Sequence, residues 1–79
     1  MLDYRKAASD GSTIVYEYAI EGRRDKIGHV SLNTETGDAR MTDHEASLEH
    51  ARYASKLMDD LESRLSSGNL KEAGTLMWY

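Results

Sequence analysis

The chain has 79 residues and contains no cysteine, which limits it to a single small domain and excludes disulfides and thiolate metal sites. Its formal net charge of −4 argues against direct binding of nucleic acid, which needs clustered lysine and arginine, and against binding to anionic membranes. A domain of this size buries a modest core, so a partner subunit is the most available source of further stability.

The first residues carry no localisation signal that we recognise. Residues 1–12 (MLDYRKAASDGS) lack the apolar run of a signal peptide. No stretch approaches the roughly 20 apolar residues of a membrane span. We therefore expect a cytoplasmic protein, in which residues 1–12 are a loosely ordered lead-in and residues 13–79 form a single α+β domain. Within the lead-in, Leu2 and Tyr4 could form a short strand or pack on a partner.

Residues 13–21 (TIVYEYAIE) show the alternation of a β-strand. The even positions carry apolar and aromatic side chains and should face the core. The odd face is half polar and includes Val15 and Ala19. We expect this strand to form one side of a hairpin.

Residues 26–33 (KIGHVSLN) predict the second strand, with Val30 and Leu32 on the same face as Gly28. Two readings of Gly28 are open. Either it forms a bulge that returns Ile27 to the core, or it makes room for an opposing tyrosine ring. A turn with Gly37 in the left-handed region then leads to a short third strand over residues 39–41.

A long amphipathic helix is predicted over residues 43–67. Thr42 and Glu45 have the spacing of a capping box at its start, and Gly68 is expected just beyond its end. One apolar stripe recurs at helical spacing and comprises Ala51, Ala54, Leu57, Met58, Leu61 and Leu65.

Residues 75–79 (TLMWY) predict a final strand that is apolar on both faces. The expected fold is therefore α+β, in the order β-β-β-α-β: a three-stranded antiparallel meander, one long helix packed on one sheet face, and a C-terminal strand. The simplest sheet order places the last strand beside the first and parallel to it, through a right-handed crossover.

No motif predicts catalysis, a metal site or a cofactor. His44 and His50 are six residues apart, whereas two metal ligands on one helix face need a spacing of four. His29 should lie opposite Glu17 or Glu21, and such a pair could act as a general base or a pH-sensitive contact. An ordinary cross-strand polar pair is the simpler interpretation, so we expect a protein that is not an enzyme.

The leading functional hypothesis is a protein–protein interaction module of unknown specific role. A single helix covers one face of a sheet, which leaves the other face bare unless residues 1–8 cover it. We expect a homodimer through the open sheet face or the C-terminal strand. The predicted interface residues are Val15, Ala19, Met77, Trp78 and Tyr79.

Two alternatives remain. One is a small regulatory or inhibitory protein, of a phage or plasmid type, whose acidic helix surface blocks a basic site on a nucleic-acid-handling protein. Its contact residues would be Glu45, Glu49, Asp59, Asp60 and Glu62. The other is a small-ligand binder or enzyme subunit that uses His29.

Overall fold

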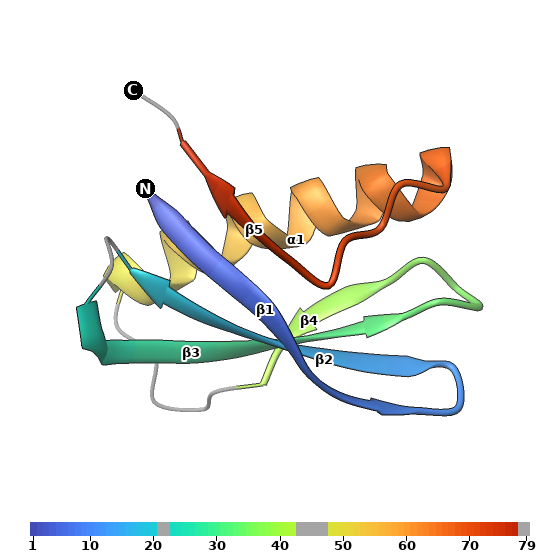
Figure 1. Ribbon diagram of the computed structural model, residues 1–79, viewed down its shortest axis with the longest axis horizontal. Helices are drawn as coiled ribbons and strands as arrows, with labels where there is room; N and C mark the ends of the chain where they lie inside the picture. Colours follow the sequence, from blue (N-terminus) through green and yellow to red (C-terminus); the bar gives the residue numbers. More distant parts are fainter. Residues whose placement is uncertain (21–22, 43–47, 78–79) are drawn as a thin grey trace.

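The computed structural model describes residues 1–20, 23–42 and 48–77. Within these residues the chain forms one antiparallel sheet in the order β4-β3-β2-β1-β5, with one helix (Figure 1). In chain order the elements are β1 (Leu2–Asp10), β2 (Thr13–Ile20), β3 (Arg23–Asn33), β4 (Ala39–Met41), α1 (Leu48–Ser67) and β5 (Ala73–Leu76). The α+β class with a single long helix is confirmed, whereas the order β-β-β-α-β is wrong in one respect, because four strands precede the helix.

The additional strand is β1, which comes from the segment interpreted as a lead-in. It lies inside the sheet, between β2 and β5, and pairs with β2 from Leu2–Ile20 to Asp10–Thr13. Leu2 and Tyr4 are buried, whereas residues 5–10 are exposed. Residues 1–8 therefore extend the sheet in its own plane, and the idea that they cover its bare face is wrong.

The insertion of β1 also changes the neighbour of the last strand. β5 pairs with β1 in antiparallel register, from Leu2–Leu76 to Arg5–Ala73. It consequently runs parallel to β2, as expected, but it does not touch β2 directly. The predicted strand began at Thr75, two residues later than β5, and its last two residues lie outside the described part of the chain.

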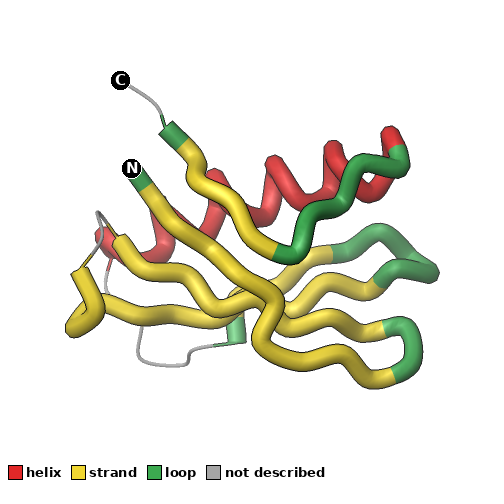
Figure 2. The backbone as a smooth tube through the Cα atoms, viewed as in Figure 1, coloured by secondary structure: helices red, strands yellow, loops and turns green. Residues whose placement is uncertain are grey.

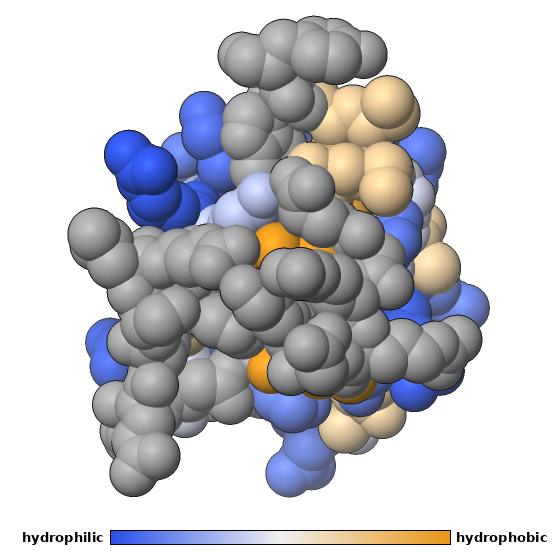
Figure 3. All heavy atoms as spheres, turned by 90° about the vertical axis from the view of Figure 1, so that its left-hand side faces the viewer, coloured by the Kyte–Doolittle hydropathy of each residue, from blue (hydrophilic) through white to orange (hydrophobic). Residues whose placement is uncertain are grey.

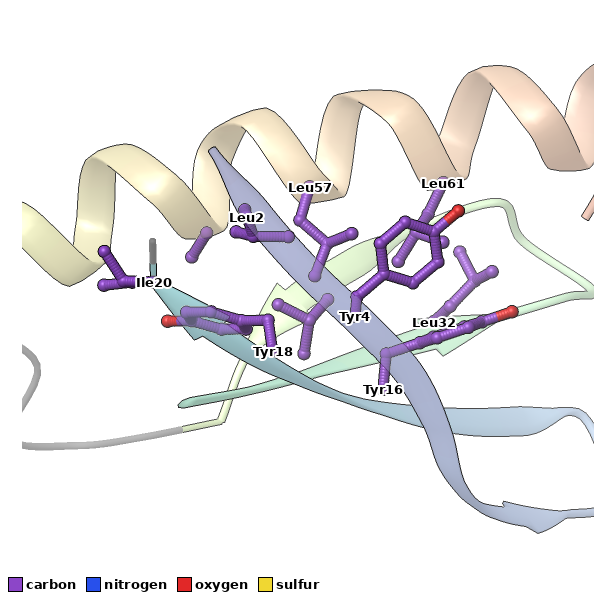
Figure 4. Close-up of a cluster of buried hydrophobic side chains, with 10 residues drawn as sticks. Leu2, Tyr4, Tyr16, Tyr18, Ile20, Leu32, Leu57 and Leu61 are labelled. Carbon is purple, nitrogen blue, oxygen red and sulfur yellow. The ribbon is translucent and has the colours of Figure 1, made fainter. Parts of the chain in front are cut away.

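The helix covers one face of the sheet (Figure 2). It buries Ala54, Leu57 and Leu61. Side chains of β1, β2 and β3 rise from the sheet to meet them (Figure 4), and the buried ones are Leu2, Tyr4, Tyr16, Tyr18, Ile20, Val30 and Leu32. Residues 43–47, with the expected capping glutamate, lie outside the described residues. The helix ends before Gly68, whose φ of 76° is the left-handed conformation predicted for that position.

Gly28 makes room for a tyrosine ring. It pairs with Tyr18 across β2 and β3, and a Cβ atom at Gly28 would overlap that ring. The register shift lies instead between Ala19 and Ile20, so the bulge considered at Gly28 is wrong. As a result Ile27 stays on the face away from the helix. Tyr4 and Gly74 form a second pair of this kind across β1 and β5.

Two tyrosines on adjacent strands, Tyr4 of β1 and Tyr16 of β2, contact each other in the core. The rings of Tyr4 and Tyr16 meet edge to face, with centroids 5.8 Å apart and planes at 70°. The Tyr16 hydroxyl donates a hydrogen bond to the backbone oxygen of Lys71, at 3.1 Å. Burial raises the pKa of both phenols above the ordinary value, which means that the fold favours their neutral form.

Candidate interaction surface

The sheet face opposite α1, here called the open face, carries rows of side chains from adjacent strands. One row consists of Arg5, Glu17 and His29. The next row towards the start of β1 contains Asp3, Ala19 and Ile27. Odd-numbered residues of β2 therefore lie on this face, as the sequence predicted for Val15 and Ala19.

The central row is polar. Arg5 Nη2 lies 3.4 Å from Glu17 Oε1, and His29 Nε2 lies 3.9 Å from Glu17 Oε2. Of the two carboxylates expected opposite His29, the structure places Glu17 there. All three side chains reach solvent, and ion pairs of this kind contribute about 1 kcal/mol or less. The row is therefore best understood as a cross-strand contact.

Beside this row lies a shallow depression of about 240 Å³. Its walls combine acidic, basic and apolar side chains, namely Asp3, Arg5, Glu17, Ala19 and Ile27, with Tyr4 and Tyr18 beneath. Asp3 is held in place because its Oδ1 accepts a hydrogen bond from Thr75 Oγ1 of β5, at 2.7 Å. The positions of Asp3 and Arg5 on this face were not predicted, because residues 1–12 were interpreted as a loosely ordered lead-in.

Large apolar side chains also reach solvent. Among the described residues these are Met1, Ile27 and Met77, which are 42%, 41% and 65% exposed. Met1 and Met77 flank the paired Leu2 and Leu76, and alternation along the strands places both on the side away from the core. Figure 3 views that end of the molecule and shows exposed apolar atoms, in pale orange, on one side of it.

The structure describes three of the five predicted interface residues. Val15 and Ala19 are half-buried on the open face, and Met77 is exposed. Trp78 and Tyr79 lie outside the described residues. Met1 and Ile27, which the predicted interface did not include, are also exposed. Ile27 lies on the open face, one of the two positions that the sequence left open for it.

The open face carries only a small part of the molecule's acidic charge. Its described charged side chains include three carboxylates, Asp3, Asp10 and Glu17, and two guanidinium groups, Arg5 and Arg40. At one edge of the sheet, next to β1, strand β5 (AGTL) contains no charged residue. A second molecule with the same net charge of −4 would meet less repulsion here than elsewhere.

The predicted acidic surface of the helix is partly committed to contacts within the molecule. Asp60 Oδ2 accepts a hydrogen bond from Arg64 Nε at 2.8 Å, and Glu62 Oε1 accepts one from the Ala39 backbone N–H at 3.1 Å. Asp59 is exposed. Glu45 and the side chain of Glu49 lie outside the described part of the chain.

Two further findings concern metals and membranes. The described residues contain no cluster of three or more histidine and acidic side chains able to hold a metal ion. In the same part of the chain, no helix is both long and apolar enough to span a bilayer.

Comparison with models of protein families, with curated proteins and with solved structures finds no match for this chain.

Proposed function

We propose that this protein is a small protein–protein interaction module that works as a homodimer. The interface is the β5 side of the molecule, defined as β5, Met1, Met77 and the adjoining part of the open face. The observation that carries the proposal is the exposure of Met1 and Met77 at the adjoining ends of the neighbouring strands β1 and β5. Methionine is enriched in protein interfaces, and its flexible side chain adapts to a partner's surface.

A second copy is the partner best suited to this side. Both copies carry a charge of −4, so long-range repulsion opposes their approach through most of the surface. On the β5 side this repulsion is reduced, because β5 is uncharged and the neighbouring open face carries both acidic and basic side chains. The acidic-inhibitor alternative has less support, because Asp60 and Glu62 already bind groups of the same chain.

Sedimentation equilibrium over a wide range of protein concentrations tests the proposal. We expect the natural chain to be dimeric at micromolar concentration and Met77→Lys to weaken the dimer about tenfold or more, because an ammonium group would replace an apolar side chain at the interface. Ser63→Lys, on the exposed side of α1, adds the same charge elsewhere and should leave the dimer almost unchanged. A chain that stays monomeric at every concentration refutes the proposal.

A further inference from the structure

The outer edge of β5 presents unpaired backbone groups. In antiparallel pairs, residues that exchange hydrogen bonds alternate with residues whose N–H and C=O point away. Because Lys6 N–H donates to Glu72 C=O across this pair of strands, Gly74 and Leu76 also bond towards β1. Ala73 and Thr75 therefore point outwards. Both residues are exposed, and neither backbone N–H has a partner among the described residues.

The opposite edge of the sheet is treated differently. In β4 the outward-pointing residue Ala39 donates its N–H to the Glu62 carboxylate of α1. The helix thus occupies a donor at one edge with a charged side chain, which is a common way to prevent edge-to-edge pairing. β5 has no charged residue, no proline and no register shift that would serve the same purpose.

We infer that β5 pairs in antiparallel fashion with β5 of a second copy, so that Ala73 lies opposite Thr75 of the partner subunit. This inference rests on the proposed homodimer and specifies its interface. In this register each of the two outward residues both donates and accepts, which gives four backbone hydrogen bonds across the two-fold axis. Gly74 meets Gly74 of the partner subunit, and the two sheets become continuous.

The side chains next to β5 fit this register. Glu72 lies opposite Leu76 of the partner subunit, so the two Glu72 carboxylates do not face each other. Met77 lies opposite Lys71 of the partner subunit, whose aliphatic stem can cover an apolar side chain while its ammonium group remains in water. This pairing would account for the exposure of Met77 in a single copy.

β5 is also held in a fixed position before it meets a partner. The Thr75 side chain is bonded to Asp3, and the ring of Tyr4 packs against the backbone of Gly74. Lys6 forms an ion pair with Glu72 at 3.4 Å. A strand that is already extended and anchored loses little conformational freedom on pairing.

Amide hydrogen exchange on the unmodified chain tests the inference directly. We expect the Ala73 and Thr75 amides to become at least about tenfold slower to exchange as the protein passes from monomer to dimer. The Gly74 and Leu76 amides, which bond to β1, are the internal control. They should be protected both in dilute samples, where the protein is monomeric, and in concentrated samples, where it is dimeric. Rapid exchange of Ala73 and Thr75 in a sample that sedimentation shows to be dimeric overturns the inference but not the proposed function. A chain that is monomeric at every concentration overturns the proposed function itself.

Two substitutions at Thr75 give a second test. Thr75→Pro removes an outward N–H that β1 does not use, and proline is tolerated at such edge positions. Thr75→Val keeps the N–H and loses only the hydroxyl bond to Asp3. We expect the dissociation constant of the dimer to rise about tenfold or more with proline and to change little with valine.

Ile27→Glu separates edge pairing from packing of two open faces. Ile27 lies on β3, which is separated from β5 by β2 and β1, and edge pairing leaves it uncovered. The dimer should therefore survive this change. Loss of the dimer in Ile27→Glu together with its retention in Thr75→Pro would overturn the inference. Circular dichroism confirms folding of each variant, and the exchange experiment decides the matter should the proline variant not fold.

Discussion

Gly28 and Gly74 leave room for the ring of an opposing tyrosine, and this need for space explains why both positions are glycine. Neither has a positive φ, so a side chain would not strain the backbone there. Each lies opposite a tyrosine whose ring occupies the volume that a Cβ would take, Tyr18 over Gly28 and Tyr4 over Gly74. Aromatic rings placed over glycines in this way are a known means of fixing strand register.

This arrangement predicts the cost of adding one methyl group. Gly28→Ala should lower the free energy of unfolding by about 1–3 kcal/mol, because the buried Tyr18 ring must move within a packed core. Gly74→Ala should cost less stability. The atom nearest to its added Cβ would be the Tyr4 hydroxyl oxygen, at 2.8 Å, and the ring carbon that bears this hydroxyl would be 3.0 Å from the Cβ. Urea denaturation of both variants and of the natural chain measures these free energies of unfolding. If both variants were as stable as the natural chain, the tyrosine rings would adjust freely to the added methyl group.

At the scale of elements, alternation predicted β2 and β3, the turn at Gly37 predicted β4, and helical spacing predicted α1, but no such pattern extends along β1. The second half of β1 contains arginine, lysine, alanine, serine and aspartate, all exposed, and these residues have no strong preference for strands. Their conformation is imposed by pairing with β2 and β5. The open-face positions of Asp3 and Arg5, which depend on β1, were therefore not predicted, whereas those of Val15 and Ala19 followed from the alternation of β2 alone.

The contact between α1 and β4 can be tested separately. Glu62→Ala should free the outward N–H of Ala39 and speed its exchange, with a loss of about 1 kcal/mol or less of stability, because this hydrogen bond is exposed. Glu62→Gln keeps a carbonyl oxygen able to accept the bond and should retain most of the protection. Hydrogen exchange followed by NMR distinguishes the two variants. Similar exchange of Ala39 in all three chains would mean that Glu62 does not guard this edge in solution.

For the whole molecule, the charge determines how association responds to salt. Two copies carry −4 each, and the proposed contact relies on backbone hydrogen bonds and apolar side chains. Raising the ionic strength from about 0.01 to about 0.15 M shortens the screening length from about 30 to about 8 Å. We therefore expect the dimer to tighten or stay unchanged in sedimentation experiments. Clear weakening by salt would indicate ion pairs across the interface.

The meander also has a consequence for synthesis on the ribosome. Strands β1 to β4 pair with their neighbours in the order in which they are made, whereas β1 must wait for β5, about seventy residues later in the chain. Until then the nascent chain exposes the edge of β1 on which Leu2 and Tyr4 lie. Lys6 also points its backbone groups to that edge, and a charged residue there discourages premature pairing with other chains. The polar residues that made β1 hard to predict as a strand thus help to keep its free edge unpaired until β5 has been synthesised.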